Sequence, residues 1–154
     1  MARPAAYLHI DGFDSYGKLD FDKKEIRKAM RRAGTLVRGE ARKLVGKKGG
    51  SSEGDYPGLR KGRLRRSIIY RVSRPGFMVK IEPQKTADMK DFYPAFLWYG
   101  VRRGAKRGKS HKKQAATGAW RIAPRENYMV DALNRRADDV RSILRKAFSE
   151  ALEG

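Results

Sequence analysis

Positive charge is concentrated between residues 102 and 113, directly after an aromatic run. Seven cations and no acid stand in these twelve residues: Arg102, Arg103, Lys106, Arg107, Lys109, Lys112 and Lys113. Gly104 and Gly108 allow the backbone to adapt to a partner. We predict that these cations contact DNA or an acidic protein electrostatically. The alternative is a solvated loop tip that is basic only for solubility.

The aromatic run supplies an anchor for this basic segment. Its relevant members are Tyr93, Phe96, Trp98 and Tyr99. Aromatic side chains contribute large apolar areas to cores and interfaces. We therefore expect these four residues to fix the basic segment to the core or to a neighbouring subunit.

Two further segments carry cations that acids do not balance. Residues 56–81 contain eight Lys or Arg and no Asp or Glu. The expected first helix carries a basic ridge away from its apolar stripe: Lys24, Arg27, Arg31, Arg38 and Arg42. The whole chain has a net charge of +20 in 154 residues. Such a charge favours nucleic acid, an acidic protein surface or an anionic membrane as partner.

The chain offers little support for catalysis. The two histidines, His9 and His111, have no partner at metal-binding spacing. The Gly-Lys-Ser at 108–110 lacks the first glycine of a phosphate-binding loop at the required distance. Asp138 and Asp139 are adjacent, so they point apart around a helix, and the serines have no general base at a recognisable spacing. We expect no catalytic residue, no metal ligand and no cofactor.

The chain has no cysteine, which excludes disulfides and cysteine metal sites. The N-terminus has no long apolar region, and no stretch approaches 18 apolar residues. Neither a secretory signal nor a membrane span is therefore expected. We expect a soluble intracellular product with no membrane partner.

The first strong element is a helix. Asp22 and Glu25 have capping-box spacing, and apolar residues then repeat at steps of three and four to about Val45. Gly34 and Gly39 weaken this helix, unless a neighbouring element approaches closely and needs the space.

The elements around this helix follow from alternation and turn residues. Residues 7–13 are expected to form a short strand. Residues 68–72 and 77–81 alternate around a turn at 74–76, which predicts a β-hairpin. The run at 92–101 fits a short helix, a strand, or one leading into the other. The segment at 118–124 is expected to be a strand.

A second helix follows Pro124. Seven apolar positions keep steps of three and four: Val130, Leu133, Ala137, Val140, Leu144, Ala147 and Ala151. The order of elements predicts an α+β fold, an antiparallel sheet with a long N-terminal helix and a C-terminal helix packed on one face. We expect a single domain over 1–154, with flexible loops at about 46–58 and 102–117.

Three short segments fall in the order of the signatures of one phage protein family. KGRLRRSI at 61–68 resembles a T-G-x-L-R-x-S-I strand entry, and YPAFLWYG at 93–100 resembles Y-x-x-F-x-E-F/Y-G-T. APRENYMVDAL at 123–133 resembles A-R-P-F-M-R-P-A-L at the entry to the last helix. Over residues 8–152 the chain resembles the head–tail joining, or tail-completion, proteins of long-tailed bacteriophages. Trp98 and Val101 stand where that family has an acid and a threonine.

The resemblance implies a structural virion protein without enzymatic activity. Such proteins form rings, typically hexameric, that complete or terminate the tail tube and join the tail to the head. The implied partners are copies of the same chain, other neck and tail-tube proteins, and the double-stranded DNA that passes through the ring. The implied location is the virion tail or neck, after assembly in the host cytoplasm.

Two other classes of protein compete with this interpretation. A small basic nucleic-acid-binding protein would be expected to carry a helix-turn-helix or an aromatic strand face, and neither pattern is present. A nuclease or other toxin would need an acid/base or metal set, which the chain lacks. The neck layer and the ring number stay open.

Overall fold

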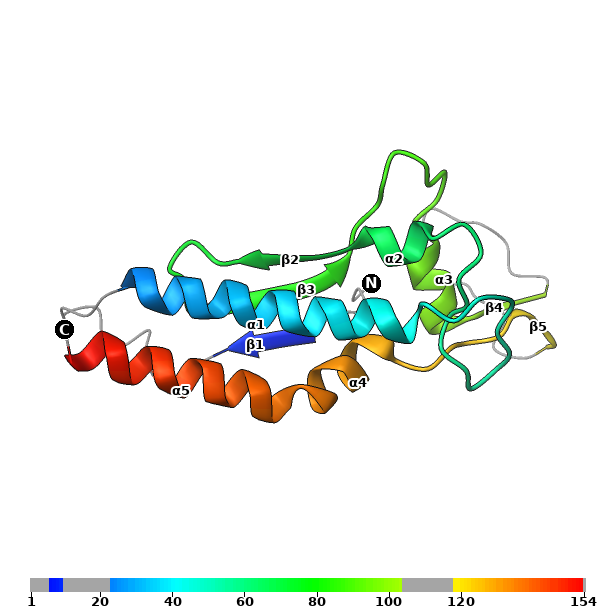
Figure 1. Ribbon diagram of the computed structural model, residues 1–154. Coiled ribbons are helices and arrows are strands. Elements are labelled where there is room, and N and C mark those ends of the chain that lie inside the picture. Colours follow the sequence, from blue (N-terminus) through cyan, green and yellow to red (C-terminus); the bar gives the residue numbers. More distant parts are fainter. Residues whose placement is uncertain (1–5, 10–22, 104–117, 154) are drawn as a thin grey trace.

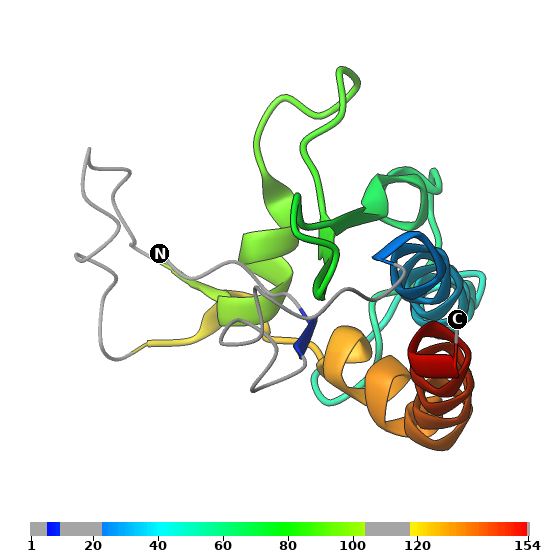
Figure 2. The same cartoon turned by 90° about the vertical axis from the view of Figure 1, so that its left-hand side faces the viewer.

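The computed structural model describes residues 6–9, 23–103 and 118–153 (Figure 1). The elements along the chain are β1 Ala6–His9, α1 Lys23–Leu44, α2 Arg63–Ser67, β2 Ile68–Val72, β3 Met78–Pro83, α3 Tyr93–Tyr99, β4 Val101–Arg102, β5 Trp120–Ile122, α4 Tyr128–Arg135 and α5 Ala137–Glu153. The predicted α+β class is confirmed, with helices packed on one face of an antiparallel sheet (Figure 2). None of the helices in these ranges is long and apolar enough to cross a membrane.

The main sheet has three antiparallel strands in the order β1-β3-β2. The predicted hairpin forms β2 and β3, where Tyr70 stands opposite Ile81 and Val72 opposite Val79. On the other side of β3, Ala6 of β1 also stands opposite Ile81. Because side chains alternate along a strand, these positions share one face of the sheet. Ala6, Val79 and Ile81 are buried there.

Helix α1 covers this face with the predicted apolar stripe. Its buried apolar side chains are Ile26, Ala29, Met30, Ala33, Val37 and Ala41. The helix comes closest to the sheet at Gly34, where a Cβ atom would stand 2.8 Å from Cδ2 of Tyr70 and 2.9 Å from Cγ2 of Val79. The close approach expected at the glycines is therefore present at Gly34. At Gly39 a Cβ atom would meet nothing within 4 Å.

The single helix expected after Pro124 is divided into α4 and α5 at Arg136, whose φ is −108° and ψ is 9°. Helix α5 packs along α1, and α4 contacts both α1 and β1. The apolar steps of three and four continue across Arg136, so the pattern alone gives no sign of the break.

The buried face of α4 differs from the predicted one. Val130 is 40% exposed, and the core side of α4 consists of Tyr128, Met129 and Ala132. The prediction for Val130 is wrong because the break at Arg136 lets α4 turn a different face to α1 and β1. Leu133 and Leu144, which belong to the predicted stripe, are partly buried and pack against the core.

The aromatic run forms a helix that leads into a strand, which was one of the three expected forms. Helix α3 ends at Tyr99, and β4 begins directly after Gly100. Strand β4 pairs antiparallel with β5, the strand expected at 118–124, with Val101 opposite Ile122. Residues 104–117, which join these two strands, lie outside the described residues, as do residues 10–22.

Candidate interface for an anionic partner

A cavity of about 520 Å³ opens at the end of the molecule where α2, α3, β5 and the loop before α2 meet. The apolar part of its wall includes Leu64, Tyr93, Leu97 and Ile122. Six cations also line it: Arg60, Lys61, Arg63, Arg65, Arg121 and Arg125. No acidic residue is among its described lining. This combination of apolar wall and unbalanced cations makes it the first candidate for a binding site.

The segment 61–68 builds one side of the cavity. Gly62 precedes α2 with a φ of 67°, in the left-handed region that favours glycine. The buried Ser67 hydroxyl donates to the carbonyl oxygen of Leu64 at 2.7 Å, and Ile68 is fully buried at the start of β2. Arg65 is exposed and lines the cavity, so packing does not account for it.

The segment 93–100 builds a second side. Tyr93 packs against the core, and burial raises the pKa of its hydroxyl. At Gly100 φ is 71°, and a Cβ atom would stand 2.7 Å from Cζ3 of Trp120 and 3.0 Å from Cδ of Pro124. Only glycine fits this position, because both the backbone angle and the surrounding atoms exclude a side chain.

Arg125 fastens the loop 46–58 beside the cavity. Its Nε donates to the hydroxyl of Ser51 at 2.9 Å, and its Nη2 donates to the Ser51 carbonyl oxygen at 2.6 Å. Its Nη1 donates to the carbonyl oxygen of Ala123 at 2.9 Å. The backbone N–H of Arg125 donates to the carbonyl oxygen of Leu97 at 2.8 Å, which joins α3 to the entry of α4. The flexibility expected of the loop stays a prediction.

The cations that line the cavity differ in whether a carboxylate is paired with them. Asp88, in the loop after β3, pairs with Arg63 at 3.2 Å and with Arg66 at 3.1 Å. A hydrogen bond from Thr86, assisted by Arg66 and Arg63, holds the pKa of Asp88 below its usual range against the opposing effect of desolvation. The other exposed cations of the lining form no ion pair with any described residue: Arg60, Lys61, Arg65 and Arg121.

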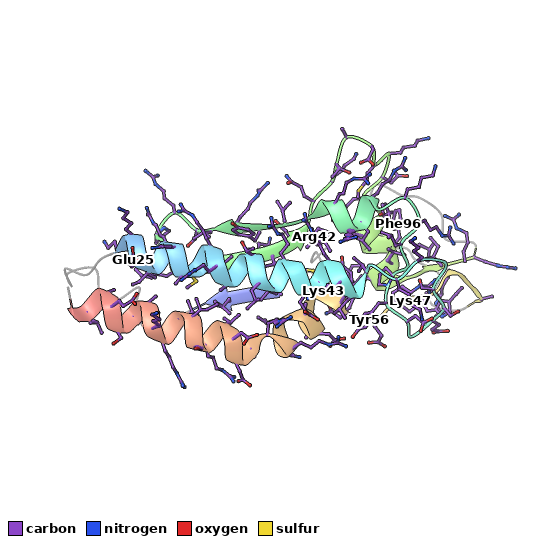
Figure 3. All side chains as sticks on the ribbon, viewed as in Figure 1. Glu25, Arg42, Lys43, Lys47, Tyr56 and Phe96 are labelled. Carbon is purple, nitrogen blue, oxygen red and sulfur yellow. The ribbon has the colours of Figure 1, made fainter. Side chains whose placement is uncertain are left out.

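The basic ridge expected on α1 partly covers the edge of the hairpin. Arg42 donates from Nη2 to the first carbonyl oxygen of β2 at 2.9 Å, and Figure 3 shows it on the side of α1 that faces α2. The guanidinium of Arg38 lies 5.0 Å from the ring centroid of Tyr70. Arg27 donates to a carbonyl oxygen of the β2–β3 turn. Each of these three residues therefore has a partner in the hairpin, although Arg27 itself is exposed.

Arg42 lies among like charges. Burial lowers its pKa, and Arg38 and Arg65 lower it further. Its Nε is buried and has no hydrogen-bond partner among the described residues. Cations of α1 and α2 thus repel one another across a short distance, and a bound anion would relieve that repulsion.

The predicted basic segment is described only at its start. The guanidinium of Arg102 lies 3.9 Å from the ring centroid of Trp120, and its Nη1 donates to the carbonyl oxygen of Gly118 at 2.6 Å. Arg103 is exposed. The other five cations lie outside the described residues: Lys106, Arg107, Lys109, Lys112 and Lys113. Their contact with DNA or an acidic protein stays a prediction.

The four predicted anchor residues lie on α3. Tyr93 contributes to the main core, as one of the two expected roles requires. Phe96, Trp98 and Tyr99 are partly exposed, and Phe96 is labelled on α3 in Figure 3. Their role at a subunit interface stays a prediction.

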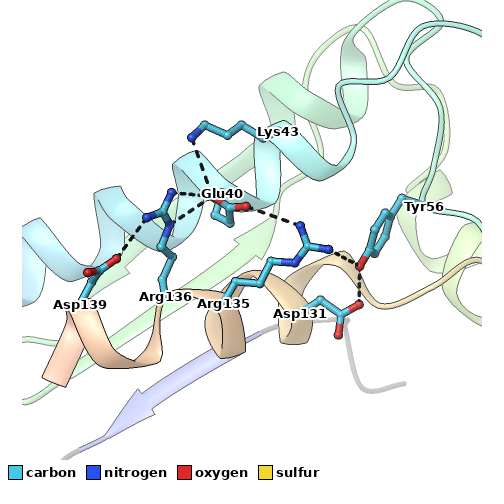
Figure 4. A network of polar contacts seen from close by, with 7 residues as sticks. All are labelled: Glu40, Lys43, Tyr56, Asp131, Arg135, Arg136 and Asp139. Atoms are coloured by element: carbon cyan, nitrogen blue, oxygen red, sulfur yellow. Dashed lines mark hydrogen bonds and ion pairs between the residues drawn. The ribbon is translucent and has the colours of Figure 1, made fainter.

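A separate polar network holds α4 and α5 against α1 (Figure 4). Arg136, at the break between the helices, donates to Glu40 of α1 at 2.9 and 3.1 Å and to Asp139 at 3.1 Å. These hydrogen bonds, that with Asp139 first, raise the pKa of Arg136. Arg135 reaches both Glu40 and the Tyr56 hydroxyl, at 3.8 and 3.5 Å. The network satisfies its own charges, so we assign it to the fold and not to a binding site.

In the part of the chain that the structure describes, no group of three or more His, Cys, Asp or Glu could hold a metal ion. Asp138 and Asp139 point to different partners, Arg141 at 3.0 Å and Arg136 at 3.1 Å, as expected of adjacent helical residues.

Comparisons of the chain with protein-family profiles, with curated proteins and with solved structures find no match.

Sequence reasoning did not single out Arg121 and Arg125 as members of one site with Arg60 and Lys61. Because side chains alternate along a strand, the sequence at 120–122 does predict that Arg121 lies on the opposite face of the strand from its two apolar neighbours. Strand β5 and the loop before α2 come together through a tertiary contact, which no local sequence pattern predicts.

Proposed function

We propose that this chain is a structural subunit of a bacteriophage neck. Copies of it form a ring that completes or terminates the tail tube and joins the tail to the head. The cationic end of each subunit contacts DNA or an acidic neck or tube protein. The subunit carries out no catalysis.

The observation that carries the proposal is the meeting of the three family-like segments around one cavity. Segments 61–68, 93–100 and 123–133 are far apart in the chain, yet all three line it. Several of their shared positions have a physical reason: Gly62 and Gly100 need a positive φ, and Ser67 closes a buried hydrogen bond. Segments that fold around each other in this way support a common origin more strongly than three separate short matches.

The unbalanced cations support an anionic partner. Arg60, Lys61, Arg65 and Arg121 stand at the same end of the molecule as β4, from which the basic segment departs. Their mutual repulsion destabilises the isolated subunit, and an anionic partner would offset it.

Sedimentation velocity of the purified full-length protein tests the assembly. We expect one discrete oligomer that persists on dilution into the micromolar range. A protein that sediments as a monomer even at concentrations above this range would contradict the proposed ring.

DNA binding at several salt concentrations tests the cationic end. Each phosphate contact adds about 0.9 to the slope of log affinity against log salt for duplex DNA. Replacing Lys61, Arg65, Arg103 and Arg121 by Ser should flatten this slope if DNA is the partner. The matched control is Arg32→Ser with Arg145→Ser, two exposed cations on α1 and α5 away from the cavity. Equal slopes for both variants would exclude DNA as the partner of this end.

The second candidate is a free nucleic-acid-binding protein, which the four unbalanced cations of the cavity favour. It predicts monomers that bind DNA with the same flattening of the slope. The sedimentation experiment therefore separates the two candidates, because only the neck protein requires an oligomer.

A further inference from the structure

The cavity between α2, α3 and β5 presents two kinds of surface to a partner. The apolar part of its wall includes Leu64, Leu97 and Ile122. Its volume of about 520 Å³ lies within the roughly 300–1,000 Å³ of pockets that enclose a ligand. Four exposed cations, which form no ion pair with a described residue, also line it: Arg60, Lys61, Arg65 and Arg121. A partner that uses the whole surface therefore needs apolar groups as well as negative charge.

Arg121 stands at an irregularity of β5 beside this cavity. Pairing with β4 passes directly from Ile122 to Trp120, so Arg121 between them has no partner residue there. An extra residue of this kind is a β-bulge, which re-aims a side chain and is frequent beside functional sites. The bulge gives Arg121 a role that regular pairing of β4 with β5 does not require.

Duplex DNA matches only the charged part of the surface. Its phosphates lie on the outside of a convex rod that carries no apolar side chains. Such a rod would contact the exposed cations and leave Leu64, Leu97 and Ile122 uncovered. An extended peptide matches both parts, because its carboxylates pair with Arg and Lys while its apolar side chains enter the cavity.

A second copy of this chain is a poor source of such a peptide. Each copy carries a net charge of +20, so two copies repel each other at long range. Seven of the described acids also pair with cations of their own subunit: Glu25, Glu40, Glu82, Asp88, Asp138, Asp139 and Glu150. The complementary carboxylates are therefore expected from a different protein.

We propose that the cavity binds an extended acidic segment of a different protein, one that carries both carboxylates and apolar side chains. The carboxylates face the four cations without ion pairs, and the apolar side chains pack on Leu64, Leu97 and Ile122. This inference rests on the proposed function and names the partner of the cationic end as an acidic neck or tube protein, not DNA.

Fluorescence anisotropy of labelled peptides with the purified full-length protein tests the class of ligand. A peptide of Glu-Glu-Leu repeats should bind at least about 10-fold more tightly than peptides of equal length with Glu-Glu-Ser or Gln-Gln-Leu repeats. The first of these controls lacks the apolar groups, and the second lacks the charges. Equal affinity for the Glu-Glu-Leu and Glu-Glu-Ser peptides would overturn the proposal, because charge alone would then explain binding.

Charge reversal tests whether the cavity is the site. Lys61→Glu with Arg65→Glu should weaken binding of the Glu-Glu-Leu peptide at least about 10-fold. The matched control is Arg32→Glu with Arg145→Glu, which makes the same change of net charge at exposed residues of α1 and α5 and should keep nearly wild-type affinity. Equal affinities of these two variants would overturn the proposal.

A second pair of cavity residues guards against a folding defect. Arg60→Glu with Arg121→Glu should weaken binding to a similar extent. Because none of the four replaced cavity residues forms an ion pair with a described residue, both variants should keep the thermal midpoint of the wild type. Wild-type affinity in a folded Arg60→Glu and Arg121→Glu variant would count against the cavity as the site.

The outcomes for the two proposals are distinct. A wild-type protein that sediments as a monomer contradicts the proposed ring, whatever the cavity binds. A ring-forming protein that binds duplex DNA but not the Glu-Glu-Leu peptide leaves the neck function standing and overturns this inference. Loss of the oligomer in both cavity variants would assign the cavity to a contact between copies and overturn it as well.

Discussion

At the scale of single residues, two tyrosine hydroxyls beside α4 have opposite surroundings. The hydroxyl of Tyr56 donates to Asp131 at 2.8 Å, and this hydrogen bond raises the pKa of Tyr56. The hydroxyl of Tyr128 is buried and has no hydrogen-bond partner among the described residues, and burial raises its pKa. One hydroxyl therefore stabilises the fold, and the other costs free energy.

Replacing each tyrosine by phenylalanine measures this difference. Tyr56→Phe should lower the free energy of unfolding by about 1 kcal/mol, because a hydrogen bond to a carboxylate is lost in a partly exposed position. Tyr128→Phe should leave it unchanged or raise it by up to about 1–3 kcal/mol, because a buried hydroxyl without a partner is removed. Urea denaturation at neutral pH checks both values. A larger loss for Tyr128→Phe than for Tyr56→Phe would contradict the assignment.

The buried hydroxyl of Tyr128 also affects the stability of the fold at alkaline pH. The folded state keeps Tyr128 protonated beyond the pH at which the unfolded chain ionises it, at about 10. Because burial disfavours its ionised form, Tyr128 makes stability fall as the pH rises above that value, whereas below it the hydroxyl is neutral in both states and has no pH-dependent effect. Tyr128→Phe should flatten the decline of stability above about pH 10. An unchanged slope of stability against pH would show that burial of this hydroxyl is not maintained in solution.

At the scale of elements, the contact between α1 and the sheet depends on one of two helical glycines. The sequence predicted the helix, its apolar stripe and the hairpin beneath it, because each has a local period. It also predicted that a close approach would explain the glycines, but it could not tell which one. That distinction needs the position of Tyr70 and Val79, which lie a long way along the chain from Gly34.

Alanine at the two glycines should have opposite effects. Gly39→Ala should stabilise the protein by about 0.5–1 kcal/mol, because alanine favours helix and nothing lies in its way. Gly34→Ala should destabilise it by about 1–3 kcal/mol, because the new methyl group overlaps Tyr70 and Val79. Thermal melts of both variants provide the check. Stabilisation by both substitutions would mean that α1 and the sheet are further apart than described.

The loop 46–58 illustrates a limit of local patterns. Its five glycines predict a flexible loop, which stays a prediction, but they do not predict that Ser51 is hydrogen-bonded to Arg125. Arg125 lies far away in the chain and belongs to the entry of α4, so glycine content carries no information about this contact.

Limited digestion with trypsin measures how firmly Arg125 holds this loop. Arg125→Lys keeps the number of cleavage sites but removes most of the hydrogen bonds to Ser51, so cleavage after Lys47 or Lys48 should become several-fold faster. Arg121→Lys is the control, because Arg121 has no ion pair with a described residue. Its cleavage rate should match that of the wild type. Equal rates for both variants would mean that the loop opens independently of Arg125.

At the scale of the whole molecule, the cavity gathers cations from distant segments at one end. The cationic cavity and the start of the basic segment lie at one end, and the start of α1 and the end of α5 lie at the other. The sequence predicted the excess of cations and three basic segments. It could not predict that α2, β5 and the loop before α2 surround one cavity, because that arrangement depends on contacts between distant segments. The sequence also could not predict the break between α4 and α5 at Arg136, because the apolar residues keep their steps of three and four across it.

Electron microscopy of the purified full-length protein tests the central claim most directly. If the chain is a neck subunit, we expect ring-shaped particles of uniform diameter with a central hole wide enough for duplex DNA. Dispersed single subunits in the wild-type sample, at concentrations where DNA binding is complete, would contradict the account and favour a free nucleic-acid-binding protein.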